Sequence, residues 1–416
     1  MINFIIVHSQ FETEQEINLR LSGYIEIVKS HKLTSTSQFV CDKPSNLSVA
    51  KWSEKPVVIL VATGGTEQAV AEIIQNFTLP VLIIAPNQKN AVAASLEIYS
   101  VFKHKKNILL KYVNSPLQLD IVLNDFIDAA NAIYKINKAK IGAIGSASEW
   151  LLTSKDIDSF GNFDTELKYI PTETLIDLVA ETKDEDQTVK NFELKLSEYS
   201  KNDKVTKDEI IQSGKVYSSL KSICNNLGLQ AVTIRCFDLL PYKYTACMGL
   251  SFLNDEGITG GCEGDLHATF SMMIANLITG DPAWMANPSS IDFDENCITV
   301  AHCSTPLKML LPKTVELHTH MESDLSVAVS GKLQKIEVTV FRTGDNFDKM
   351  LAITGKIIAS NMQDANLCRT QAIIKLDGDV SKWLDNSLGN HQVIVYGNIL
   401  EKLKVFCKLS DIELIL

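Results

Sequence analysis

Short apolar runs alternate with amphipathic stretches through the first 140 or so residues of the chain. Runs of aliphatic and β-branched residues predict strands, and apolar positions that recur every three to four residues predict helices between them. The predicted strands cover residues 3–8, 57–62, 81–85 and 108–112, and the predicted helices cover residues 14–29, 66–75, 90–102 and 117–133. Strict alternation of strand and helix favours a parallel sheet covered on both faces, and we assign this N-terminal α/β domain to residues 1–139.

A second α/β cycle begins with the apolar run at residues 140–144. It continues with predicted strands at 167–170 and 231–236 and a predicted helix at 210–227. Residues 183–209 are dense in charge and poor in aromatics, which allows a linker but favours a solvated helix. We expect a second α/β domain over residues 140–305.

Beyond residue 305 the pattern changes to β-branched alternation, in runs at 325–329, 335–341, 371–375 and 392–396. Turn signals rich in Gly, Asp and Asn separate several of these runs. This alternation, with turns between the runs, is typical of antiparallel strands. The predicted fold class is therefore α/β, with two Rossmann-like parallel-sheet α/β domains followed by a C-terminal antiparallel β-barrel-like domain over residues 306–416.

Composition narrows the class of protein further. The chain has 416 residues with 45% hydrophobic and 21% charged residues, which is ordinary for several folded domains. A formal net charge of -11 disfavours non-specific electrostatic binding to nucleic acid or anionic lipid. No apolar run approaches the roughly 18 residues of a membrane helix, and the N-terminus lacks a signal-peptide pattern. Nine cysteines without a CxxC pair fit a reduced compartment, so we expect a cytoplasmic protein.

The usual nucleotide and hydrolase motifs do not occur in the sequence. The segment Gly64-Gly65-Thr66-Glu67 follows a predicted strand and opens a predicted helix, where backbone N–H groups could hold an anion. A tight turn capped by Thr66 is the favoured alternative.

The densest polar segment is GGCEGDLH at residues 260–267, immediately before a predicted buried helix. Glu263 therefore lies at a strand end or in the turn that follows it. In doubly wound sheets, ligands bind beyond the carboxyl ends of the strands. The structural alternative makes Asp265 a helix cap and Glu263 a solvated acid of the first turn.

Two short β-like runs each end on a polar residue. Asn287 follows the run at 283–286, and His302 follows the run at 297–301. The connection between them is short, so the second run can be antiparallel and point His302 away from Asn287.

Further histidines lie nearer the C-terminus. His318 and His320 fall on one face of a predicted strand that continues to Glu322, although alternating histidines are more often a solvated face than a ligand set. His391 lies in a turn before the strand at 392–396.

The order of these motifs resembles the L-fucose isomerase and L-arabinose isomerase superfamily, particularly its shorter fucose-isomerase-like branch. That family carries a glutamate before a long helix, matched by Glu263 in Glu-Gly-Asp, and an acid after the helix, where Asn287 stands. A C-terminal histidine after Gly-Asn is matched by His391, and the additional histidine of arabinose isomerases is matched by His302. The similarity is specific over residues 230–400.

The resemblance implies a metal-dependent aldose–ketose isomerase that interconverts a free pentose or 6-deoxyhexose with its ketose through an enediol. It implies a divalent cation, usually Mn²⁺, and a homo-oligomer, trimer or hexamer, whose sites are completed by a neighbouring subunit. The implied roles are metal binding by Glu263, Asn287 and His391, catalysis by Glu263 and Asn287, and substrate binding by His302, His320 and Glu322.

Asn287 departs from the family pattern. An amide can offer an oxygen to a hard cation, but it adds no charge and takes no proton near neutral pH. Glu263 is then the only obvious carboxylate base, with Glu322 or Asp265 left to supply the second proton-transfer group. Two alternatives stay open: a sugar-binding or altered relative that has lost the proton shuttle, and a scaffold without a ligand.

Overall fold

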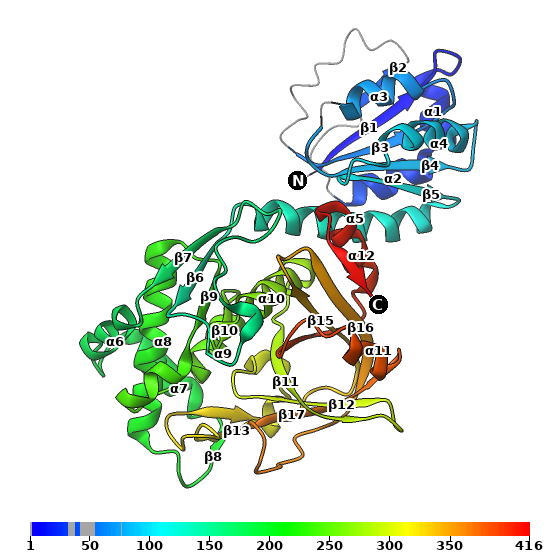
Figure 1. Ribbon diagram of the computed structural model, residues 1–416. Coiled ribbons are helices and arrows are strands. Elements are labelled where there is room, and N and C mark those ends of the chain that lie inside the picture. Colours follow the sequence, from blue (N-terminus) through cyan, green and yellow to red (C-terminus); the bar gives the residue numbers. More distant parts are fainter. Residues whose placement is uncertain (1, 32–37, 42–54, 76) are drawn as a thin grey trace. The chain divides into compact units, whose positions relative to one another are not determined.

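The computed structural model describes residues 2–31, 38–41, 55–75 and 77–416 (Figure 1). The chain forms two compact units: Met1–Tyr134 with Glu401–Ile412, and Lys135–Leu400 with Glu413–Leu416. The C-terminal segment Glu401–Ile412 thus belongs to the first unit, whereas the sequence pattern groups it with the β-rich region. In the part of the chain that the structure describes, no helix combines the length and hydropathy needed to cross a bilayer.

The first unit is built on a five-stranded parallel sheet with the order β2-β1-β3-β4-β5. Its strands are β1 (Asn3–His8), β2 (Gln38–Cys41), β3 (Val57–Val61), β4 (Val81–Pro86) and β5 (Ile108–Val113). Its helices are α1 (Glu14–Arg20), α2 (Ser22–Ser30), α3 (Glu67–Gln75), α4 (Ala91–Phe102), most of α5 (Pro116–Ile136) and most of α12 (Leu400–Ser410). The strand order reverses between β1 and β3, which is where doubly wound sheets open a crevice.

Two local predictions in this unit are refined by the structure. The single helix predicted at 14–29 is divided at Leu21, whose φ of -102° and ψ of 15° are not helical. The segment after β3 is a tight turn, in which the buried Thr66 hydroxyl donates a hydrogen bond to the Thr63 carbonyl at 3.0 Å.

The second unit contains a four-stranded parallel sheet with the order β10-β9-β6-β7. Its strands are β6 (Lys140–Ile144), β7 (Glu166–Ile170), β9 (Ala231–Ile234) and β10 (Thr259–Cys262). The helices are α6 (Thr172–Glu181), α7 (Gln187–Leu196), α8 (Lys207–Leu227), α9 (Cys247–Asp255) and α10 (Leu266–Thr279). The charged stretch at 183–209 contains α7, so the solvated-helix interpretation is confirmed there.

The same unit contains a closed antiparallel barrel of six strands in the order β15-β18-β11-β12-β17-β16, closed by pairing of β15 with β16. The expected fold class is therefore confirmed. β11 and β12 are barrel strands, although their sequence groups them with the second α/β region. The strands are β11 (Trp284–Asp292), β12 (Cys297–His302), β15 (Glu337–Gly344), β16 (Lys349–Ser360), β17 (Thr370–Leu376) and β18 (Gln392–Tyr396).

Smaller elements complete the second unit. The helix α11 (Val380–Asp385) precedes β18, and β19 (Glu413–Ile415) pairs in parallel with β16. A separate small sheet has the order β14-β13-β8, formed by β8 (Ser200–Lys201), β13 (Glu316–His318) and β14 (Ala328–Ser330).

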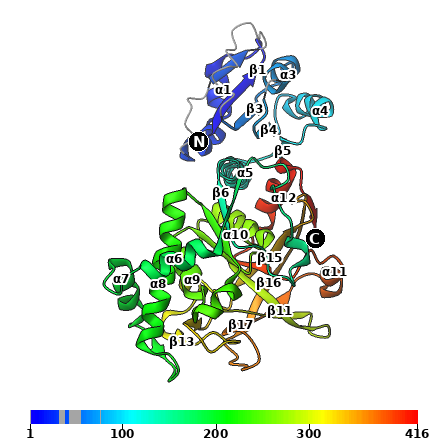
Figure 2. The same cartoon turned by 60° about the vertical axis from the view of Figure 1, so that its left-hand side comes forward.

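The helix α10 joins the sheet to the barrel. It is buried along nearly its whole length and packs on β9 and β10 of the sheet and on β11, β15 and β18 of the barrel. The two views show α10 on the barrel side of the sheet and α8 on the opposite side (Figures 1 and 2). The first turn of α10 therefore lies where strand ends of both layers meet.

Candidate functional site

Glu263 projects from a tight turn between β10 and α10. Its φ of +60° lies in the left-handed region, and Gly264 follows with a φ of +72°. A side chain at Gly264 would be strained and would place its Cβ 2.6 Å from the Ser146 carbonyl oxygen. A non-glycine residue in this conformation is uncommon and is often held there at functional sites. Glu263 is only 8% exposed, which contradicts the alternative of a solvated first-turn acid.

Asp265 is the N-cap of α10, as the structural alternative predicts, and it also binds a buried arginine. Its Oδ1 accepts hydrogen bonds from the Ala268 N–H at 2.9 Å and the Ser154 hydroxyl at 3.0 Å. The Arg342 guanidinium donates to both carboxylate oxygens, at 2.8 and 3.2 Å. Burial raises the pKa of Asp265, but the charges of Arg342 and His391 outweigh it and hold the pKa well below its usual value.

These bonds occupy both oxygens of Asp265, and its side chain is fully buried. Asp265 is therefore a structural carboxylate and not the second proton-transfer group. The arginine that it binds is packed tightly: a Cβ at Gly389, whose φ is +149°, would lie 2.6 Å from Arg342 Nε.

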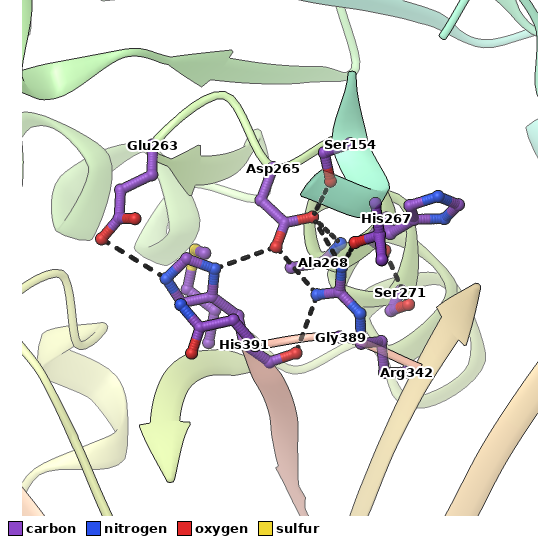
Figure 3. A network of polar contacts seen from close by, with 12 residues as sticks. Ser154, Glu263, Asp265, His267, Ala268, Ser271, Arg342, Gly389 and His391 are labelled. Atoms are coloured by element: carbon purple, nitrogen blue, oxygen red, sulfur yellow. Dashed lines mark hydrogen bonds and ion pairs between the residues drawn. The ribbon is translucent and has the colours of Figure 1, made fainter. Parts of the chain in front are cut away.

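His391 lies between the two carboxylates, immediately before β18 (Figure 3). Its Nδ1 is 2.9 Å from Asp265 Oδ2, and its Nε2 is 3.5 Å from Glu263 Oε1. Because Asp265 accepts the Nδ1 proton, Nε2 is the nitrogen directed toward Glu263, and a cation would take the place of the proton on Nε2. This carboxylate–histidine pairing is typical of metal ligands, whose orientation it fixes.

Charge within this group shifts both pKa values. Burial lowers the pKa of His391, but hydrogen bonds and charges of Asp265 and Glu263 outweigh burial and raise it to about 9. Burial raises the pKa of Glu263, but hydrogen bonding and charge from His391, the charge of His302 and a hydrogen bond from Trp150 lower it to about 2. Glu263 is thus ionised across the physiological range.

His302 completes the cluster from the last position of β12. Single ligand atoms of Glu263, His302 and His391 all lie within 4.8 Å of one another. Burial and the positive charge of His391 lower the pKa of His302 to about 3, so this ring is neutral. Its Nδ1 accepts a hydrogen bond from the Ser304 N–H at 3.3 Å and lies 2.9 Å from the Ser304 hydroxyl, so Ser304 fixes the orientation of the ring.

The antiparallel pairing of β11 and β12 brings His302 into the cluster with Glu263 and His391. Antiparallel pairing puts the end of β12 beside the start of β11, and β18 also begins beside the start of β11. His302 and His391 therefore meet at one end of the barrel, with ring centroids 5.4 Å apart. The expectation that an antiparallel strand turns His302 away is wrong.

Asn287 lies within β11, which continues to Asp292 and does not end at Asn287 as the sequence pattern suggests. Pairing of Ala286 with Gln392 puts the Asn287 backbone opposite position 391. By strand alternation Asn287 shares a face with Met285, whose sulfur accepts the Cys262 N–H at 3.1 Å, one residue before Glu263. The Asn287 Oδ1 is buried and has no hydrogen-bond partner among the described residues.

His320 and Glu322 follow β13 in a loop. β13 ends at His318, so the two histidines do not share a strand face as predicted. Burial, followed by the charge of Arg369, lowers the pKa of His320, while the charge of Glu263 opposes this shift. Burial of its carboxyl group, together with the charge of Glu263, raises the pKa of Glu322. His320 is buried, whereas Glu322 is exposed.

Two residues of this site went unnoticed in the sequence. Arg342 directly follows the predicted strand at 335–341 and is fully buried in β15, where a charged residue needs an ion-pair partner. Trp150 donates its indole N–H to Glu263 Oε2 at 2.6 Å from a loop that carries no local motif.

The donor set fits a divalent cation. Two buried atoms on neighbouring strand segments, His391 Nε2 and Asn287 Oδ1, lack hydrogen-bond partners in the described part of the chain. Together with a Glu263 oxygen and a His302 nitrogen they offer two oxygens and two imidazole nitrogens, a set suited to first-row divalent metals. The buried group of Glu263, His302 and His391 could thus hold a metal ion.

No model of a known protein family matches the chain. The chain is similar to the sulfoquinovose isomerase of Clostridium sp. (strain MSTE9), with 23% identity over 307 residues that cover 70% of this chain and 67% of that protein. The sulfoquinovose isomerase of Priestia aryabhattai is 24% identical over 216 residues, 50% of this chain and 48% of that protein. That of Alkalicoccus urumqiensis is 26% identical over 132 residues, 30% of each.

These relatives confirm the expectation of an isomerase. The last two matches cover half of the relatives or less. The substrate, the metal and the assembly of this chain are therefore taken up as proposals.

Proposed function

We propose that this protein is a metal-dependent aldose–ketose isomerase of the fucose and arabinose isomerase type. The observation that carries the proposal is the convergence of Glu263, His302 and His391, whose ligand atoms lie within 4.8 Å of one another. These residues come from the sheet end and from two barrel strands, and they stand in the order that the family motifs predict. Relatives that are isomerases of a sugar support the same reaction class.

The cation of this site is proposed to be Mn²⁺, held by Glu263, His302, His391 and the Asn287 carbonyl. A bound divalent cation would act as a Lewis acid toward two sugar oxygens and stabilise the negative charge of an enediolate. Asp265 orients His391 toward this position through the 2.9 Å contact at Nδ1. Arg342 and Ser154 hold Asp265 in turn, so the ligand geometry is fixed before substrate arrives.

The proton chemistry is assigned to two glutamates whose environments move their pKa values apart. Glu263 is ionised because its pKa is lowered to about 2, and it accepts the proton from one sugar carbon and returns it to the next. Glu322, whose pKa is raised by partial burial of its carboxyl group and by the charge of Glu263, is assigned the exchange of protons with the sugar hydroxyls. Asn287 positions substrate or cation and carries no proton.

The proposed substrate is a free pentose or 6-deoxyhexose. Sulfoquinovose, the sugar in the relatives' name, is the second candidate, since it is a 6-deoxyhexose with a sulfonate on C6. Arg235 lies just after β9 near the site, but Glu149 at 2.9 Å and Asp238 at 3.1 Å offset its charge. A sulfonate would have to compete with both carboxylates, so this observation favours the neutral sugars.

We further propose that the protein is a cytoplasmic homo-oligomer, a trimer or hexamer, in which a neighbouring subunit completes each site. The surface suited to this role is a cavity of about 640 Å³ in the first unit, at the carboxyl ends of β1 and β3. It is lined by polar residues such as Ser9 and Thr63, and by Phe11, which is 88% exposed.

The deciding experiment measures metal affinity by titration calorimetry and turnover of fucose and arabinose stereoisomers and sulfoquinovose. Glu263→Gln should lower turnover by about 10² to 10⁴ while the protein stays folded. Glu173→Gln, at an exposed position of α6, is the matched control and should behave as the parent. Parental turnover in Glu263→Gln would refute the proposed role. Sugar binding without turnover by the parent would select the alternative, a binding relative that lost the proton shuttle at Asn287.

A further inference from the structure

The loop after β6 packs against the turn that carries Glu263 and Gly264. The Ser148 N–H donates to the Glu263 carbonyl at 2.8 Å, and Gly264 packs directly against the backbone of Ser146 and Ala147. The loop is therefore anchored on both residues of the left-handed turn. Its next large side chain is Trp150.

The two oxygens of the Glu263 carboxylate face different partners, Trp150 and His391. Its indole N–H is 2.6 Å from Oε2, whereas Oε1 faces His391 Nε2 at 3.5 Å. A hydrogen bond to a charged group is stronger than one between neutral groups, and it restricts rotation of the carboxylate. Oε1 is thereby directed toward the ligand cluster.

The ring of Trp150 is nevertheless 49% exposed, although its N–H reaches a carboxylate that is 8% exposed. Phe237 meets it edge-on, with centroids 5.1 Å apart and planes at 87°. The His320 ring lies edge-on to Phe237 at 6.1 Å. An apolar ring that is both held rigidly and left uncovered beside a buried charge is typical of a ligand contact, because little conformational entropy is lost when it binds.

We infer that Trp150 is a specificity-determining residue, which offers its ring to the C–H face of the sugar while its N–H positions Glu263. This inference rests on the proposed function and deepens it. The ligand class is a monosaccharide with an apolar C–H face, packed against the aromatic row of Trp150, Phe237 and His320. Trp150 acts on the reaction through Glu263 and touches the substrate with its ring.

Two substitutions separate the two roles. Trp150→Phe keeps a ring and removes the N–H donor, so kcat should fall about tenfold or more while KM changes by less than about threefold. Trp150→Ala removes both, so KM should additionally rise by about tenfold. Leu152→Ala is the matched control, since Leu152 is an apolar residue of the same region that is 76% exposed. It should leave both constants at the parental values, and all variants should melt at the parental temperature.

A second measurement does not depend on turnover. Sugar added to the metal-loaded parent should change the tryptophan emission, and Trp150→Phe should abolish that change although Trp52, Trp284 and Trp383 remain. An emission change that persists in Trp150→Phe, or parental kcat and KM in both substitutions, would overturn the inference while an active parent leaves the proposed function intact. A parent that neither binds nor converts any sugar would overturn both.

Discussion

Replacing Arg342 by methionine tests the buried network that holds the site. Arg342 and Asp265 are both fully buried, and the guanidinium donates to the two carboxylate oxygens at 2.8 and 3.2 Å. Methionine fills much of the same volume but donates no hydrogen bond. Asp265 would then remain buried with a charge that has lost its main partner.

The expected loss can be worked from these contacts. Two hydrogen bonds to a charged group at about 1.5 to 3 kcal/mol each give roughly 3 to 6 kcal/mol. Breaking a buried ion pair by removing one partner typically costs about 3 to 5 kcal/mol. We therefore expect Arg342→Met to lower the free energy of unfolding of the second unit by about 3 to 5 kcal/mol. The double substitution Arg342→Met with Asp265→Asn should recover part of this loss, because no unpaired charge is left.

The assay is guanidinium unfolding followed by tryptophan emission in a Trp52→Phe background, since the three remaining tryptophans, Trp150, Trp284 and Trp383, all lie in the second unit. The transition of that unit should move to lower denaturant with an unchanged slope. A loss below about 1 kcal/mol in Arg342→Met would refute the reasoning. So would a double variant that is less stable than the sum of the single changes, because the coupling would then have the wrong sign.

Three further outcomes are expected. Asn287→Asp should tighten Mn²⁺ binding at least tenfold in titration calorimetry, about 1.4 kcal/mol, because a unit charge is added beside a divalent ion; equal affinities would mean that Asn287 does not face the cation. Gly389→Ala should destabilise the second unit in thermal unfolding, since its Cβ would lie 2.6 Å from Arg342 Nε, and an unchanged melting temperature would contradict that packing. Burial and the charge of Arg342 lower the pKa of His267 to about 4. As the pH falls, the unfolded state therefore binds a proton on this ring before the folded state does. The free energy of unfolding should then fall by up to about 1.4 kcal/mol per pH unit between about pH 6.5 and pH 4. His267→Phe should remove that contribution, and an acid-unfolding curve that is the same for parent and variant would argue against it.

The periodicity of the chain predicts most of the fold because each local pattern has one structural solution. Buried parallel strands such as β3 and β4 are continuous apolar runs of five and six residues, a length that favours a strand over a helix. Barrel closure is different. It depends on the pairing of β15 with β16 and on β11 and β12 joining distant strands, and no local signal records partners that far away in the sequence.

The site residues likewise fall into those with a signal in the sequence and those that depend on contacts between distant segments. Glu263 can be singled out because it stands between a strand end and a buried helix, beside Gly264, whereas His391 is singled out by its match to the C-terminal histidine of the family motif. The participation of His302 depends on which end of the barrel three antiparallel strands share, which only the register settles. Trp150 reaches Glu263 across a loop in a contact between distant segments, and an exposed tryptophan has no sequence signature of its own.

The position of α10 between sheet and barrel has a consequence for how a cation would act on the whole second unit. Glu263 directly follows β10 of the sheet, whereas His302 ends the barrel strand β12 and His391 immediately precedes the barrel strand β18. An ion held by all three would add a cross-link between two layers that already contact each other through α10, the Asp265–Arg342 ion pair and the Cys262–Met285 hydrogen bond. It binds only the assembled state, so mass action adds RT ln(1 + [M]/Kd) to the stability, about 2.7 kcal/mol at a hundredfold excess over Kd. The concentration of free metal would then determine the stability of the second unit as well as the rate of isomerisation.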